Sequence, residues 1–236
     1  VLALLLLACA AAPLFAQRAA DPTPDAVAAA LRQAPPAHPR LFADAAGFAA
    51  LKESAAADTF ARAALGRLLH DADQMLALPP NTRKMEGRRL LGVSRSVLHR
   101  VSTLAMAYRL GGNPAHRDRC AAEMLAATAF TDWNPSHFLD VAEMSLALAV
   151  GYDWLYHDLA PATRDTLAAA LMEKGLRTSL KHTGWVKASN NWGQVCHAGM
   201  LAAALALQER DEALAIQIAH RAIVNLPRSM RAFAPK

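Results

Sequence analysis

Residues 189–197 gather amide and imidazole side chains within a sequence that is otherwise rich in alanine and leucine. The pattern predicts a helix over about residues 190–208. At 3.6 residues per turn, Asn190, Gln194 and His197 share one face of this helix, and Asn191 lies beside it. These hydrogen-bonding groups indicate a binding site. The structural alternative is a helix cap followed by buried polar groups that bond to neighbouring helices.

The first residues are apolar and end in small residues before Gln17 and Arg18. Residues 1–16 are therefore interpreted as a secretory signal peptide, which predicts a periplasmic or secreted protein. The run is too short to predict a membrane span. A second interpretation is a bacterial lipobox, in which Cys9 would carry a lipid anchor. Cys120 and Cys196 lie in helical patterns and are predicted to be buried thiols.

The charge balance indicates an anionic partner. The 236 residues include 25 Lys and Arg against 20 Asp and Glu, for a net charge of +5. No long basic run is present, and export favours an anionic polysaccharide over a nucleic acid. The histidines are scattered and the two mature cysteines lack partners at ligand spacing, so no metal site is predicted. No other cofactor is implied.

The helical patterns occur in pairs, which predicts an all-α fold of repeated αα-hairpins. Gly111 and Gly112 end one helix, whereas Asn113 and Pro114 begin the next. The pairs start about 48, 46 and 52 residues apart, so the hairpins must stack to bury their apolar faces. Residues 17–43 form a lead-in segment, and residues 44–236 form the helical domain. The predicted pairs are 44–56 with 58–77, 92–110 with 114–128, 138–157 with 162–181, and 190–208 with 211–226.

The segments that precede the second, third and fourth pairs should meet at one end of such a stack. They carry cationic, aromatic and amide side chains, which suit the binding of acidic sugars by ion pairing and ring stacking. Taken singly, the tryptophans could be core residues and the arginines solvated. The predicted substrate-binding residues are Arg88, Arg89, Trp133, His137, Trp192 and Gln194.

Four motifs, taken in their order, resemble the N-terminal half of the heparinase II/III-like polysaccharide lyases, which include oligoalginate lyases. They occupy residues 38–42, 133–144, 151–155 and 189–192. The resemblance covers most of the mature chain. It implies an incomplete (α/α) toroid followed by a β-rich region. Because the sequence stops at Lys236, the chain is predicted to be a fragment that lacks this region and is inactive alone.

The resemblance also implies a reaction, the β-elimination of a uronic acid. By similarity, Asn191, with Asn190 as second choice, would bind the sugar carboxylate and stabilise the charge that develops on it. Some members place a histidine where this chain has Trp192, so His197 is the candidate imidazole for proton transfer. The main catalytic tyrosine is expected beyond Lys236. Tyr152 is predicted to pack.

Two other function classes remain open at the level of sequence. An α/α-toroid glycoside hydrolase would need two carboxyl groups, for which Asp140 and Glu143 are the nearest candidates. A non-catalytic helical-repeat protein that binds glycans would need only the surface.

Overall fold

The computed structural model describes residues 21–34 and 37–231, and its regular secondary structure over these ranges is entirely helical. The all-α prediction is therefore confirmed for the part of the chain that is described. The predicted signal peptide and Cys9 lie outside these residues. Within the same ranges, each helix is too short or too polar to cross a bilayer.

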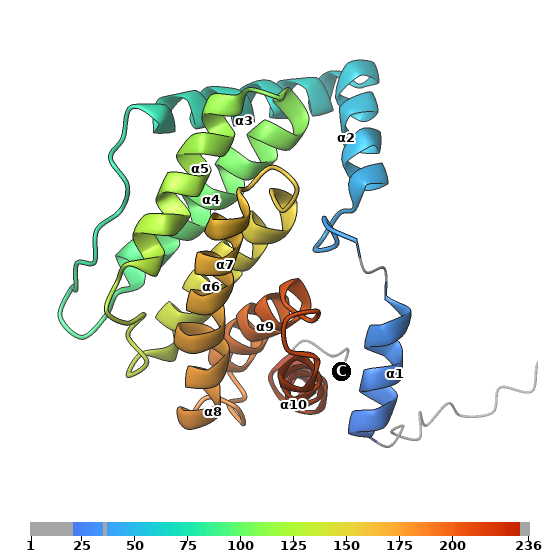
Figure 1. Ribbon diagram of the computed structural model, residues 1–236, viewed down its shortest axis with the longest axis vertical. Helices are drawn as coiled ribbons and strands as arrows, with labels where there is room; N and C mark the ends of the chain where they lie inside the picture. Colours follow the sequence, from blue (N-terminus) through green and yellow to red (C-terminus); the bar gives the residue numbers. More distant parts are fainter. Residues whose placement is uncertain (1–20, 35–36, 232–236) are drawn as a thin grey trace, which may run out of the picture.

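Helices are present over each of the predicted pairs, and the second, third and fourth pairs follow one another in space (Figure 1). Helix α4 packs against α6, and α6 packs against α9, so the first helices of successive pairs lie side by side. Helix α6 is apolar on almost every side and is the most enclosed of the three. The pairs are α2 (Ala45–Ala57) with α3 (Thr59–Leu76), α4 (Leu91–Gly111) with α5 (Pro114–Thr128), α6 (Phe138–Trp154) with α7 (Pro161–Ala170), η1 (Leu171–Arg177) and α8 (Thr178–Lys181), and α9 (Asn191–Ala206) with α10 (Glu212–Met230).

Local capping explains why the boundaries were predictable. Gly112 ends α4 with a φ of 77°, a left-handed conformation that glycine adopts without steric cost. The side chain of Asn113 then accepts a hydrogen bond from the Ala115 N–H at 3.0 Å, and Pro114 occupies the first turn of α5. Three consecutive residues thus stop one helix and start the next.

Two features of the fold were not predicted. Helix α1 (Pro24–Gln33) lies inside the predicted lead-in segment and packs against α10. The predicted helix over residues 162–181 contains the π-helical segment η1. Its Gly175 lies so close to α6 that an added Cβ would be 2.6 Å from the Ser145 hydroxyl oxygen. This close approach leaves no space for a side chain.

The lead-in is held against α6 by one buried carboxylate. Asp153 accepts hydrogen bonds from the backbone N–H groups of Arg40, at 2.9 Å, and Leu41, at 2.8 Å. Its other oxygen lies 2.6 Å from Nδ1 of His38, whose Nε2 lies 3.1 Å from Glu209. The motifs at residues 38–42 and 151–155 are therefore structural partners, and we call these contacts the lead-in clamp.

Helices α6 and α9 approach closely at glycine. A methyl group on Gly199 would collide with the carbonyl oxygen of Ala142. We expect Gly199→Ala to lower the free energy of unfolding by about 1–3 kcal/mol, the usual cost of overpacking. Gly66→Ala, on the exposed side of α3 with nothing within 4 Å, should instead stabilise by up to about 1 kcal/mol. Urea denaturation measures both, and equal midpoints would contradict the close packing.

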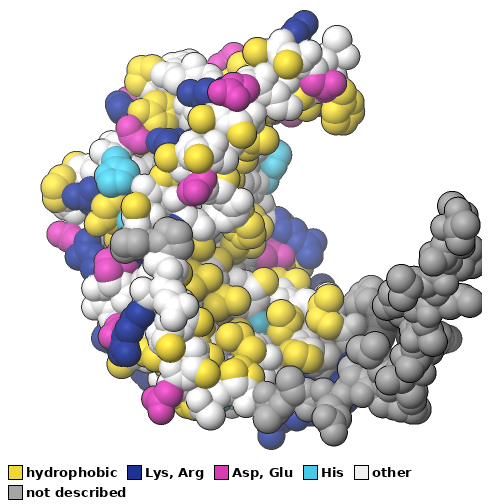
Figure 2. All heavy atoms as spheres, turned by 90° about the vertical axis from the view of Figure 1, so that its right-hand side faces the viewer, with side chains coloured by type: hydrophobic (Ala, Val, Ile, Leu, Met, Phe, Trp, Pro, Cys, Tyr) yellow, Lys and Arg dark blue, Asp and Glu magenta, His cyan; other side chains and the backbone are white. Residues whose placement is uncertain are grey.

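The molecule is hollowed beneath the arm that α2 and α3 form, and hydrophobic side chains gather along the wall of this hollow (Figure 2). A cavity of about 630 Å³ lies between the lead-in, the start of α2 and the end of α9. Its wall includes Leu41, Phe42, Leu51 and Leu205, so it is largely apolar.

Candidate functional site

The segments that precede α4, α6 and α9 are in contact, as the stacking of hairpins predicted. The side-chain amide of Asn134 donates to the carbonyl oxygen of Arg88 at 2.9 Å, which joins the first two segments. The ring of His137 meets that of Trp192 edge-on with centroids 5.0 Å apart, which joins the second and third. Polar residues from three distant parts of the sequence therefore share one end of the stack.

Asp140 organises this end of the molecule. Its buried carboxylate accepts hydrogen bonds from the Leu90 N–H and from the side-chain amide of Asn134, both at 2.7 Å. The Leu90 bond satisfies a donor at the start of α4, which has no side-chain cap of its own. Asn134 adopts a φ of 58°, a left-handed conformation that asparagine tolerates better than most residues.

The same carboxylate orients His137. Nδ1 of the imidazole lies 2.9 Å from the Asp140 carboxylate, and the His137 side chain is 15% exposed. Nε2 has no hydrogen-bond partner among the described residues. A buried carboxylate that holds one imidazole nitrogen leaves the other available for a substrate or for proton transfer. His137 thus keeps the accessibility that its predicted binding role requires.

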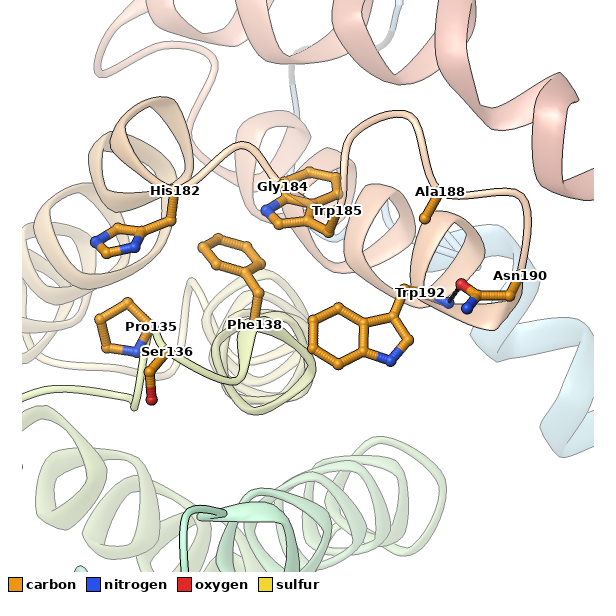
Figure 3. A pocket seen from close by; sticks show the side chains of 9 residues that line it. All are labelled: Pro135, Ser136, Phe138, His182, Gly184, Trp185, Ala188, Asn190 and Trp192. Carbon is orange, nitrogen blue, oxygen red and sulfur yellow. Dashed lines mark hydrogen bonds between the residues drawn. The ribbon is translucent and has the colours of Figure 1, made fainter.

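A cavity of about 420 Å³ opens beside these residues, between the starts of α6 and α9 and the loop that follows α8 (Figure 3). Three aromatic rings and a proline supply apolar walls, and hydroxyl, imidazole and amide groups supply polar ones. Among the described residues, no carboxylate lines the cavity. Its main lining residues are Pro135, Ser136, Phe138, His182, Trp185, Asn190 and Trp192.

The two neighbouring asparagines have different roles. Asn190 is the N-cap of α9, because its side-chain oxygen accepts a hydrogen bond from the Trp192 N–H at 3.1 Å. Asn191 is the first residue of the helix and is exposed. Its amide makes no hydrogen bond with any described residue. The capping function therefore explains Asn190 and leaves the Asn191 amide available to a ligand.

Three predicted site residues are held by contacts inside the protein, and two of them, Trp133 and His197, are fully buried. Trp133 is 1% exposed and its ring nitrogen donates to the Ala127 carbonyl oxygen at 3.1 Å, so it cannot stack on a sugar. Its prediction as a binding residue was wrong, because the ring fills the core next to η1. Gln194 is half-buried and donates to the Ser229 carbonyl oxygen at 3.2 Å. It therefore joins α9 to α10.

His197, like Trp133, is buried and is 1% exposed. Nε2 lies 3.0 Å from the Val186 carbonyl oxygen, which can only accept, so this nitrogen carries the proton. Burial lowers the pKa of the imidazole, and the nearby Arg221 charge acts in the same direction. A neutral, enclosed histidine bonded to a loop is structural, and its prediction as the proton-transfer group was wrong for this conformation.

The predicted arginines lie in a tight turn before α4. Backbone hydrogen bonds between Glu86 and Arg89 close the turn, and Gly87 has a φ of 60°. The side chains of Arg88 and Arg89 are exposed and have no ion-pair partner among the described residues. They are free to approach an anion, as a binding role requires.

The carboxyl pair considered for a hydrolase is already engaged. Asp140 holds three protein donors, and Glu143 accepts from the Ser94 hydroxyl at 2.7 Å and pairs with Arg95.

Cys120 and Cys196 are buried free thiols, and burial raises the pKa of Cys196 to about 12. Over the described ranges, no group of three or more His, Cys, Asp or Glu side chains is arranged to hold a metal ion. Tyr152 is fully buried, which confirms its packing role.

Comparison with known proteins gives no assignment. No protein-family model matches the chain, and no curated protein matches it at a significant level.

Sequence reasoning did not select Trp185, His182, Ser136 or Phe138, although they line the cavity. Trp185 belongs to the aromatic segment before α9 and carried a usable signal. The other three have no distinctive spacing, and only the packing of α6 against the loop after α8 brings them together.

Proposed function

We propose that this chain is the uronate-binding, N-terminal part of a polysaccharide lyase that cleaves alginate-like or glycosaminoglycan-like polymers by β-elimination. The observation that carries the proposal is the meeting of the segments before α4, α6 and α9. There, two arginines and an amide that have no partner among the described residues lie at the same end as an aromatic-walled cavity. Their chemistry suits an acidic sugar, and the resemblance of the motifs supplies the reaction.

Each group has a role in the proposed reaction. The Asn191 amide donates to the uronate carboxylate, where negative charge develops as the C5 proton leaves. His137, held by Asp140, replaces His197 as the imidazole that assists proton transfer. Arg88 and Arg89 attract the polyanion, and Trp192 offers a ring against which a sugar can pack. As the resemblance implies, the proposed lyase also has a region that completes the toroid and a catalytic tyrosine.

The product of the reaction provides the first test. With the product of the whole gene, uronate polymers should yield oligosaccharides that carry a C4–C5 double bond and absorb in the ultraviolet. Neutral glucan or mannan should yield none. Because the arginines act through charge, binding of uronate oligomers should weaken as salt rises, since about 0.15 M salt screens exposed charges beyond about 8 Å.

The outcomes separate the three function classes. Reducing sugar released without the ultraviolet absorbance would overturn the lyase in favour of a hydrolase. Salt-sensitive binding of uronates without cleavage would favour a glycan-binding repeat protein. Equal affinity for neutral and uronate oligomers, measured by calorimetry, would contradict the assignment of an anionic substrate.

A further inference from the structure

The cavity at the starts of α6 and α9 is lined by a residue whose hydrogen-bond donor has no acceptor in the described part of the chain. Trp185 is 3% exposed, and its ring nitrogen is buried without a partner among the described residues. The ring stacks on Phe138, with centroids 4.9 Å apart, and lines the cavity. Figure 3 shows the nitrogen on the edge of the ring that is turned toward His182 and Phe138. An indole N–H can only donate, so the described residues leave this donor available to the acceptor of a ligand.

A positive charge lies over the face of the Trp185 ring. The Arg221 guanidinium is 5.0 Å from the centre of the Trp185 ring and donates to the carbonyl and hydroxyl oxygens of Ser179, at 2.8 and 2.6 Å. No carboxylate of the described residues pairs with it. Burial lowers the pKa of Arg221 to about 10, so the group remains charged at neutral pH. The charge is thus not neutralised within the described part of the chain.

The N-terminal ends of two helices add to the positive potential that Arg221 creates at the cavity. Helices α6 and α9, of 17 and 16 residues, both begin at the cavity, and their N-terminal ends carry partial positive charge. Asn190 lines the cavity; its side-chain oxygen caps α9, and its side-chain nitrogen has no acceptor among the described residues. Because no described carboxylate lines the cavity, it presents donors and positive potential together.

We infer that this cavity is a subsite for the carboxylate of an acidic sugar. The carboxylate accepts a hydrogen bond from the Trp185 ring nitrogen, while Trp192 and Pro135 pack against the sugar ring. Arg221 acts through the indole as a positioning residue that favours a negative ligand. The choice of a sugar rests on the proposed function, whereas the preference for an anion rests on these contacts alone.

The test uses the 236-residue chain and D-glucuronate as the probe. The protein has four tryptophans, so its ¹H–¹⁵N spectrum contains four indole resonances. Glucuronate should shift the Trp185 resonance, and methyl glucoside at the same concentration should not. A Trp185 resonance that stays unmoved by glucuronate at about 100 mM would overturn the subsite. An equal shift on adding inorganic sulfate would overturn its assignment to a sugar carboxylate.

Substitution provides an independent measurement. Trp185→Phe keeps an aromatic ring on Phe138 and removes the N–H, so affinity for glucuronate should fall about tenfold or more. The matched control is Trp154→Phe, which removes the hydrogen bond from an indole to Leu41 outside the cavity, and it should keep full affinity. Equal affinity of both variants would overturn the role of Trp185.

The Arg221→Met variant should reduce binding of glucuronate and leave weak binding of methyl glucoside unchanged. Equal losses for both ligands would make the role of Arg221 merely structural.

Failure of the proposed subsite can be distinguished from failure of the lyase proposal. The subsite is measured by binding to the chain alone, and cleavage is measured by the unsaturated product of the whole gene. A shifted Trp185 resonance without any unsaturated product would retain the subsite and remove the lyase.

Discussion

Asn191→Ala should lower turnover on uronate polymers by about a hundredfold or more while leaving the protein folded. This is the scale of loss when one preorganised donor to a developing negative charge is removed. Because Asn190 caps α9, replacing Asn191 should change the free energy of unfolding by no more than about 0.5 kcal/mol. Steady-state kinetics on the product of the whole gene and thermal unfolding measure the two effects.

The matched control is Asn113→Ala, which removes the capping amide of α5. We expect it to cost about 1 kcal/mol of stability and to leave turnover unchanged. The two variants should therefore show opposite patterns. Full turnover by a folded Asn191→Ala protein would contradict the carboxylate-binding role and leave Asn191 as an ordinary surface residue at the first turn of a helix.

Asp153→Ala should destabilise the protein by about 3–5 kcal/mol, the cost of removing one partner from a buried, hydrogen-bonded charge pair. The substitution removes the carboxylate that the Arg40 and Leu41 N–H groups and Nδ1 of His38 contact, while Nε2 of His38 keeps Glu209. Denaturant titration gives the change. Asp118→Ala, which removes an exposed ion pair on α5, should leave the midpoint unchanged within error and serves as the control.

The loss of stability in Asp153→Ala should also depend on pH, and the protonation of His38 sets the direction of this dependence. Burial opposes the charged imidazole, but hydrogen bonds with Asp153 and Glu209 outweigh burial and raise its pKa above 6.5. A raised pKa in the folded state contributes stability that is complete below pH 6.5 and disappears as pH rises through the folded value. The difference between the wild-type protein and Asp153→Ala should therefore narrow as pH rises above 6.5. A difference that widens would contradict the lead-in clamp.

The helix pairs were predictable because their boundaries are encoded locally. Gly112, Asn113 and Pro114 each favour a termination or an initiation regardless of the surroundings. The π-helical segment was not predictable, since it depends on how closely Gly175 approaches α6. Only tertiary packing contains that information.

The contact between the segments before α4, α6 and α9 was predicted more successfully than the exposure of their individual side chains. Stacked hairpins require the starts of their first helices to meet, and they do. Periodicity also places Gln194 and His197 on one face of a helix, but it does not say what covers that face. Here α10 and the loop before α9 cover it. For the same reason, the sequence could not distinguish the buried ring of Trp133 from the partly exposed ring of Trp192.

The contact between α1 and α10 has a consequence for how the stack unfolds. A linear array of repeats frays from its ends, because each terminal repeat has only one neighbour. Here the first described helix packs on the last, and Arg32 pairs with Glu212 across 180 residues of sequence, at 2.7 Å. Loss of either end therefore removes a neighbour from the other. Unfolding of the two ends becomes thermodynamically coupled, and folding must wait for contacts of high sequence separation, which are slow to form.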